Sequence, residues 1–161
     1  MDYTLREIGH GDLEPVLRIF NHFVRESFAA YPDEEVGAWF VEVLRPDTRY
    51  PFLVVEYGEE VVGFGCLRPF RRGKVFSRTA ELTYFVLPEH CGRGIGSRLL
   101  DQLEEWAKGR GIDNLLANVS SRNEESIGFH KAKGFVECGR FLDVGRKFEE
   151  DFDIIWLQRR I

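Results

Sequence analysis

Three glycines stand within five positions of the stretch "PEHCGRGIGSRLL", at Gly92, Gly94 and Gly96, directly before an amphipathic segment. Glycine permits positive φ and leaves no Cβ in the way of a ligand. The first N–H groups of a helix lack internal partners, and the helix dipole adds partial positive charge there. The stretch therefore predicts either a ligand-free turn from strand to helix or a loop whose amides bind an anion. Spacing alone leaves both interpretations open.

Two familiar phosphate loops do not match these letters. The dinucleotide-binding pattern Gly-x-Gly-x-x-Gly fails because Leu99 stands where the third glycine is required after Gly94 and Gly96. A Walker loop fails because no Gly-Lys-Ser/Thr follows at the right distance. If the stretch binds a phosphate, it belongs to another type of loop.

A single carboxylate interrupts the otherwise apolar segment "TAELTYFVLP" (79–88), at Glu81. Burial raises the pKa of a carboxyl group in general, and this suits it to accept a proton directly or through water. The alternative is a glutamate on the solvent face of an edge strand. The spacing favours that alternative, because glutamate is seldom buried.

The composition is that of an ordinary water-soluble domain. The 161 residues suit one domain with one core, with 43% hydrophobic and 30% charged residues. No apolar run approaches the roughly 18 residues of a membrane span, and "MDYTLREIGHGD" lacks the features of a signal peptide, so we expect a cytoplasmic protein. The scattered Cys66, Cys91 and Cys138 favour neither a disulfide framework nor a metal site. A net charge of −5 argues against a nucleic-acid partner.

Hydrophobic periodicity places these segments within one mixed α/β sheet that carries helices on its faces. Asp12 and Asn123 are suited to begin helices, and Gly109 and Gly134 to end them. The helix after the glycine stretch should bury Leu99, Leu100, Leu103 and Trp106. We predict strands at 3–8, 79–88, 112–119 and 151–160, a hairpin within 51–70 that turns at 57–60, a loop at 71–78, and helices at 12–28, after 33, after 94 and after 123.

This order resembles the GNAT superfamily of acyl-CoA-dependent N-acyltransferases. The superfamily's loop, Gln/Arg-x-x-Gly-x-Gly/Ala, is similar to "CGRGIG" (91–96), and "NEESIGFHKAKGF" (123–135) is similar to its Asn-x-x-Ala-x-x-x-Tyr-x-x-x-Gly-Phe. "RIFNHFVRES", "FRRGKVFSRTAELTYFVLP" and "VGRKFEEDFDIIWLQ" resemble the phosphinothricin N-acetyltransferase branch, over nearly the whole chain. The resemblance implies a single GNAT domain over 1–161, with a mostly antiparallel central sheet flanked by helices. It also implies a homodimer and acetyl transfer from acetyl-CoA, without a metal, to the amine of a small, often amino-acid-like molecule.

The same resemblance implies where acetyl-CoA binds. The amides of the glycine loop would hold the pyrophosphate, the preceding strand would pair with the pantetheine arm, and Asn123 would bond to that arm while also capping its helix. Cys91 departs from the family's Gln/Arg, and we expect Arg93 to supply the missing charge. The expected cofactor-binding residues are Tyr84, Phe85, Val86, Gly92, Arg93, Gly94, Gly96, Ser97 and Asn123.

Acetyl transfer to an amine needs a proton acceptor for the ammonium and a proton donor for the departing thiolate. Related acetyltransferases carry a catalytic glutamate at the position of Glu81, and this favours the buried interpretation of that residue. His130 stands where many GNAT enzymes have a general-acid tyrosine and where this branch has histidine. The resemblance thus implies Glu81 as general base and His130 as proton donor or as part of a proton path with Glu81. The alternative for His130 is a histidine on a helix surface.

The resemblance places the acceptor near Tyr31, which by itself is equally suited to the core. The branch commonly has arginine where Gly73 stands and tyrosine where Phe76 stands. Arg72 or Lys74 would then have to bind an acidic group of the acceptor, or the acceptor differs from phosphinothricin. Two further interpretations stay open: acetylation of a protein amine, and a non-catalytic acyl-CoA sensor, for which Cys91 is the best support.

Overall fold

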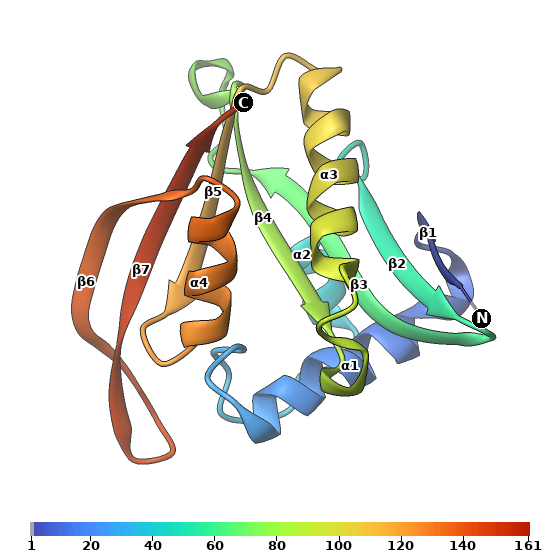
Figure 1. Ribbon diagram of the computed structural model, residues 1–161, viewed down its shortest axis with the longest axis horizontal. Coiled ribbons are helices and arrows are strands. Elements are labelled where there is room, and N and C mark those ends of the chain that lie inside the picture. Colours follow the sequence, from blue (N-terminus) through green and yellow to red (C-terminus); the bar gives the residue numbers. More distant parts are fainter. Residues whose placement is uncertain (1) are drawn as a thin grey trace.

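A seven-stranded mixed sheet runs through the computed structural model, which describes residues 2–161 (Figure 1). Its strand order is β1-β2-β3-β4-β5-β7-β6. The strands are β1 (Tyr3–Glu7), β2 (Phe52–Tyr57), β3 (Glu60–Pro69), β4 (Thr79–Val86), β5 (Asn114–Ser120), β6 (Val136–Lys147) and β7 (Glu150–Arg160). The helices are α1 (Leu13–Glu26), α2 (Trp39–Leu44), α3 (Ile95–Lys108) and α4 (Glu124–Ala132). The expected fold class is confirmed.

The centre of the sheet opens between β4 and β5, its one parallel pair. These strands pair only from Thr79 to Glu81 on β4 and from Asn114 to Leu116 on β5. Beyond that point they diverge, while every other pair in the sheet is antiparallel (Figure 1). The divergence leaves the second half of β4 without a partner on one side, in the middle of the molecule.

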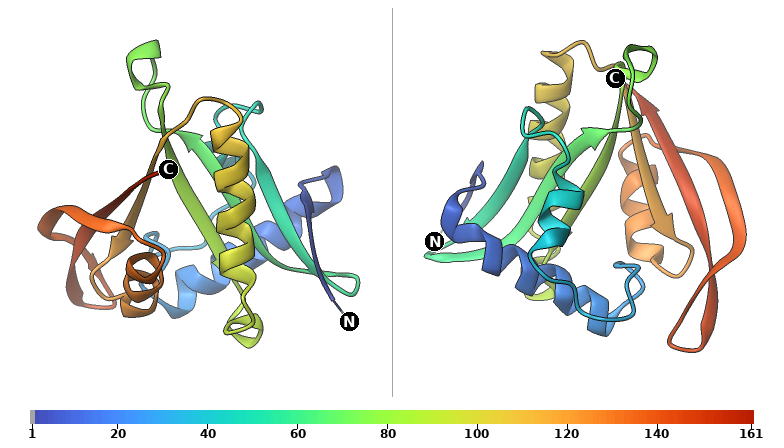
Figure 2. Two further views of the ribbon diagram at one scale, coloured as in Figure 1. Left: turned by 45° about the horizontal axis from the view of Figure 1, so that its top comes forward. Right: turned by 180° about the vertical axis from the view of Figure 1, so that it is seen from behind.

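Helices cover both faces of the sheet. α3 and α4 lie on one face and α1 and α2 on the other, as the view from behind shows (Figure 2). The core is accordingly divided into two apolar clusters, one centred on α3 and one on α1. Leu99, Leu100 and Leu103 of α3 are fully buried as expected, whereas Trp106 is only partly buried and stacks under Arg110. β4 contributes side chains to both clusters because alternate residues of a strand point to opposite faces.

The helix ends follow their local sequence with one exception. Asn123 caps α4 by accepting a hydrogen bond from the backbone N–H of Ser126 at 3.3 Å. Gly134 follows α4 at φ 88°. Asp12 stands at the N-cap position of α1, but its side chain does not cap the helix. It binds the N–H of Gly9 at 2.6 Å and the guanidinium of Arg6 instead, so Asp12 begins the helix as predicted but without a side-chain hydrogen bond to it.

The sequence did not predict β6, which pairs with β7 to form a long hairpin at one edge of the sheet. Almost all of β6 is exposed, so it lacks the alternation that marks a half-buried strand. It also contains Asp143 at φ 48° and a glycine at 145. A Cβ on Gly145 would lie 2.1 Å from Cζ of Phe152, so only glycine fits under that ring. Exposed residues with glycine and aspartate are typical of a turn or loop in a sequence. Here the hydrogen bonds to β7 make the segment a strand.

None of the helices within residues 2–161 has the length and apolar character needed to span a membrane. The same residues contain no cluster of three or more His, Cys, Asp and Glu side chains placed to hold a metal ion.

Candidate active site

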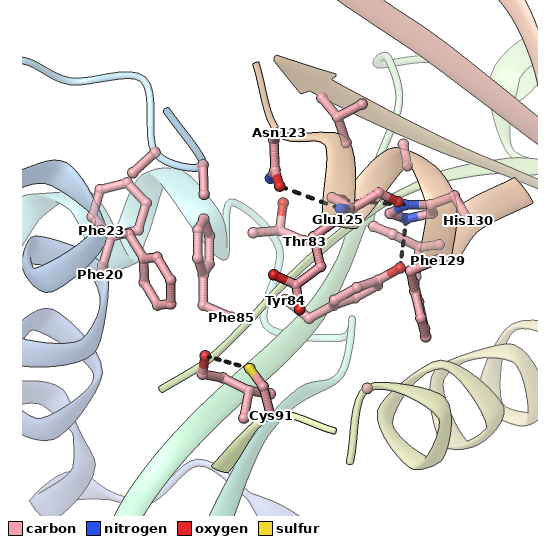
Figure 3. Close-up of a pocket in the computed structure, with 18 of the residues that line it drawn as sticks. Phe20, Phe23, Thr83, Tyr84, Phe85, Cys91, Asn123, Glu125, Phe129 and His130 are labelled. Atoms are coloured by element: carbon pink, nitrogen blue, oxygen red, sulfur yellow. Dashed lines mark hydrogen bonds between the residues drawn. The ribbon is translucent and has the colours of Figure 1, made fainter. Parts of the chain in front are cut away.

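A cavity of about 1050 Å³ lies where β4 and β5 diverge. At one end it is lined by the glycine loop and by α4, and at the other by α1, the segment 29–32 and Arg68. Figure 3 shows β4 passing between the two ends, with Tyr84 directed toward α4 and Phe85 toward α1. The cavity therefore connects the two faces of the sheet, with the glycine loop at one end and Tyr31 at the other.

The glycine loop has the conformation that an anion-binding turn requires. Gly92 and Gly94 have φ of 74° and 77°, in the left-handed region that favours glycine. A Cβ at either position would meet nothing within 4 Å, so the space beside the loop is open to a ligand. α3 begins at Ile95, and its first N–H groups have no partner within the helix. A loop of this conformation has room for an anion beside its backbone amides.

Most of the expected cofactor residues meet at this cavity. Arg93 does not: it is exposed and lies outside the lining. Cys91 lines the cavity, but its thiol donates to the backbone carbonyls of Val86 and Leu87 at 3.6 and 3.5 Å (Figure 3). Burial raises the pKa of this thiol, and the charges of Glu125 and Glu89 raise it further. The expected residues that line the cavity are Tyr84, Phe85, Val86, Gly92, Gly94, Gly96, Ser97 and Asn123.

Glu81 lies in a polar network on the α1 side of β4. Its Oε1 accepts a hydrogen bond from Nδ2 of Asn118 at 2.6 Å and forms an ion pair with Nη2 of Arg68 at 3.0 Å. Nη1 of Arg68 donates a hydrogen bond to the hydroxyl of Thr83. The side chain of Glu81 is 12% exposed, so the interpretation as a solvent-facing glutamate is wrong.

Tyr31 joins this network from the segment that follows α1. Its hydroxyl donates to Oδ1 of Asn118 at 2.8 Å, and its ring stacks on Phe152 at 5.8 Å. Burial, and then the charge of Glu81, raise the pKa of Tyr31, so the phenol remains protonated. Asn118 thus accepts a hydrogen bond from the hydroxyl of Tyr31 and donates one to the carboxylate of Glu81.

His130 lies in a second network, on the α4 side of β4. Its Nε2 is 2.5 Å from the hydroxyl of Tyr84, and its Nδ1 is 2.7 Å from the carbonyl oxygen of Ser126 (Figure 3). Burial lowers the pKa of His130, which favours the neutral imidazole. The residue is 3% exposed, so it is not on the helix surface. No side-chain hydrogen bond between residues 2–161 links the Glu81 network to the His130 network. The two networks are connected only through the cavity, which residues of both networks line.

Arg72 and Lys74 lie away from this site. Both belong to the exposed loop between β3 and β4 and neither lines the cavity. Among the residues that the structure describes, Arg68 is the only lysine or arginine in the cavity lining. Arg68 and Asn118 were not predicted as site residues, because only the arrangement of the strands pairs them with Glu81. The available signal was an arginine at the end of the apolar segment 61–67, one strand before a carboxylate that needs a partner.

Residues 16–135 match the family described as the acetyltransferase (GNAT) family. The chain is 30% identical to the L-amino acid N-acyltransferase MnaT of Escherichia coli, over 98% of this chain and 94% of that protein. It is 32% identical to a structure of ribosomal-protein-alanine N-acetyltransferase from Brucella melitensis, which superposes with a TM-score of 0.87 and covers 98% and 99% of the two chains. A phosphinothricin acetyltransferase from Sinorhizobium meliloti in complex with acetyl-CoA is 25% identical, with a TM-score of 0.90 over 100% of this chain and 89% of that one.

Proposed function

Because this chain belongs to the acetyltransferase (GNAT) family, we propose that it transfers the acetyl group of acetyl-CoA to the primary amine of a small, amino-acid-like acceptor. The observation that carries the proposal is one continuous cavity with a glycine loop at one end and Arg68, Tyr31 and the Glu81 network at the other. The activity for which MnaT is named supports the amino-acid-like acceptor, and the acetyl-CoA complex of the Sinorhizobium enzyme supports the acetyl donor.

The donor would occupy the end of the cavity at the glycine loop. The amides at the start of α3, including those of Gly96 and Ser97, would hold the pyrophosphate, and Asn123 would bond to the pantetheine. The second half of β4, from Tyr84 to Val86, lacks a strand partner on its β5 side and would pair with the same arm. Acetyl-CoA supplies the thioester carbon that the amine attacks.

The acceptor would occupy the other end. Arg68 is the available cation for an acceptor carboxylate, and its two observed contacts use two of the five N–H donors of a guanidinium. The wall beside it is aromatic, so it suits an acceptor with an apolar or uncharged polar side chain rather than a charged one. This wall consists of Phe20, Phe23, Phe40 and Phe85.

Glu81 would act as the general base for this acceptor. An amine arrives as an ammonium ion, and it attacks a thioester only after losing one proton. Glu81 is the nearest carboxylate to Arg68, and Asn118 and Arg68 fix its orientation. The free amine then attacks in a ternary complex with no acyl-enzyme, and His130 serves in the transfer of the remaining proton.

Thiol release from acetyl-CoA, measured over a panel of acceptors, tests the proposal. The panel contains L-amino acids, their sulfone and sulfoximine analogues, and a short peptide with an N-terminal alanine. We expect acceptor-dependent release with one or more small amino acids, and a loss of about 10²- to 10⁴-fold in Glu81→Gln. Release with the peptide alone would instead favour a protein amine, which is the second candidate because the Brucella relative is named as a ribosomal-protein-alanine N-acetyltransferase. Binding of acetyl-CoA with no release in any case would favour the sensor. The homodimer stays a prediction, which sedimentation would test.

A further inference from the structure

Tyr84 and His130 both line the cavity and contact each other there. The ring of Tyr84 stacks on that of His130 with centroids 5.5 Å apart, and its hydroxyl lies 2.5 Å from Nε2 (Figure 3). Tyr84 is partly exposed in the cavity, whereas His130 is 3% exposed and is packed against Phe129 and Phe135. The hydroxyl of Tyr84 therefore offers a proton in the cavity a direct route to Nε2 of His130.

The hydrogen bonds fix which nitrogen of His130 carries the proton. A backbone carbonyl can only accept, so Nδ1, at 2.7 Å from the carbonyl oxygen of Ser126, must be the protonated nitrogen. The neutral imidazole then has a lone pair on Nε2, and the hydroxyl of Tyr84 donates to it. In this resting state His130 has no proton to give to a departing thiolate, but it is prepared to receive one.

We propose that Tyr84 is a catalytic residue, whose hydroxyl passes a proton from the attacking amine to Nε2 of His130 and later returns it to the sulfur. The proposal rests on the proposed function and adds a second proton route to it. Glu81, on the opposite side of β4, takes the first proton, which turns the ammonium into a free amine. Tyr84 and His130 carry the second proton, which becomes acidic only when the new N–C bond forms.

The step balances without any additional reactant. The amine nitrogen forms a bond to the thioester carbon and becomes positively charged, and one of its protons moves to the oxygen of Tyr84. The original hydroxyl proton moves to Nε2, so His130 becomes an imidazolium that still donates through Nδ1 to Ser126. When the C–S bond breaks, its electron pair remains on sulfur and the proton returns through Tyr84. The products are the amide and the free thiol, with both side chains restored.

The position of His130 suits temporary storage of a proton. It lies in the last turn of α4, where the helix dipole stabilises a positive charge. Burial lowers its pKa, so the imidazole is neutral at the start and releases the proton again readily. Burial also raises the pKa of Tyr84, so the phenol relays a proton without accumulating as a phenolate.

Single-turnover acetyl transfer in Tyr84→Phe tests this role. The substitution keeps the stacked ring and removes only the hydroxyl, so the acetyl-CoA KM should stay within about twofold while the transfer rate falls about 100-fold. His130→Gln should lose a similar factor, and the double variant should lose no more than either single one, because both act on one proton. A solvent isotope effect on transfer should shrink in Tyr84→Phe. Tyr50→Phe is the matched control, since Tyr50 is partly buried against Trp106 outside the cavity.

Nitrogen-15 spectra of the histidine rings in the free enzyme provide a readout that does not depend on turnover. We expect the proton of His130 on Nδ1, and a shift of the Nε2 signal alone in Tyr84→Phe. A proton on Nε2, or a transfer rate in Tyr84→Phe within twofold of the unchanged enzyme, would overturn the proposal. If the unchanged enzyme transfers acetyl to no acceptor, the proposed function fails, and this second proton route fails with it.

Discussion

Arg68 and Glu81 stand directly opposite each other on β3 and β4 and form an ion pair, with Nη2 3.0 Å from Oε1. In the proposed function, the cation that binds the acceptor's carboxylate therefore touches the carboxylate that takes the proton of its amine. An α-amino acid carries these two groups on the same carbon. The spacing of the ion pair thus favours an α-amino acid over an amine whose carboxylate is distant.

Replacing Arg68 by glutamine should raise the KM for an amino-acid acceptor by about 10- to 100-fold, because a hydrogen bond to a charged group contributes about 1.5–3 kcal/mol. The corresponding amine without a carboxylate should change much less. Steady-state kinetics with L-methionine and 3-(methylthio)propylamine measure the difference. Arg72→Gln is the control and should behave as the unchanged enzyme, since Arg72 lies outside the cavity lining. An equal loss with both acceptors would contradict a carboxylate site at Arg68.

Lys147, at the end of β6, holds the segment that carries Tyr31. Its ammonium donates to the backbone carbonyls of Ser27 and Ala30, both at 2.7 Å, and the residue is 3% exposed. Lys147→Met would leave these carbonyls without a donor, at a cost of roughly 1–3 kcal/mol each. We expect a lower free energy of unfolding in urea and a higher acceptor KM, with the acetyl-CoA KM almost unchanged.

Lys131→Met is the matched control for that change, because Lys131 is exposed on α4. It should alter the free energy of unfolding by no more than about 0.5 kcal/mol. Equal effects of the two substitutions on unfolding and on the acceptor KM would show that Lys147 does not position Tyr31.

The stability of the protein should depend on pH through His130. Burial lowers its pKa below the 6.5 of an unfolded chain, so the unfolded state binds the proton more readily. The contribution of the neutral side chain is therefore complete above pH 6.5 and is lost as the pH falls through the lower folded value. The groups in contact with His130 are Tyr84, Ser126, Phe129 and Phe135, and none of them is charged at these pH values.

Thermal unfolding at a pH of about 7.5 and about 5.5 measures this dependence. The fall in Tm between the two should be larger for the unchanged protein than for His130→Gln. The exposed His10 provides the control, and His10→Gln should keep the full dependence. An identical fall in all three proteins would exclude His130 as the source.

The charge of Arg93 should affect the binding of acetyl-CoA and not that of the acceptor. Arg93 is exposed beside the glycine loop, and Cys91 occupies the position where the family has Gln or Arg. Arg93→Ala should raise the acetyl-CoA KM several-fold and leave the acceptor KM unchanged, as steady-state kinetics would show. An unchanged acetyl-CoA KM would mean that the backbone amides at the start of α3 hold the pyrophosphate without help from this side chain.

Local patterns were sufficient for most of the fold. Periodicity, caps and glycine turns predicted α1, α3, α4 and the β2–β3 hairpin, since each depends on residues close in sequence. β6 was missed because an exposed strand has no such pattern, and only its partner β7 makes it a strand. Arg72 and Lys74 lie outside the cavity lining, and the sequence could not show this because charge in a loop does not reveal where its side chains point.

The sequence by itself determined the family, the glycine loop, and the two residues expected to move protons, Glu81 and His130. Tertiary structure decided what surrounds them. The arrangement of the strands brings Arg68 and Asn118 into contact with the carboxylate of Glu81. The packing of α4 against β4 brings the hydroxyl of Tyr84 into contact with Nε2 of His130. These partners are 13 to 46 residues from the residues they contact. Hydrogen bonds form over about 3 Å, so only the assembled sheet, with β4 and β5 diverging, can bring such distant residues together.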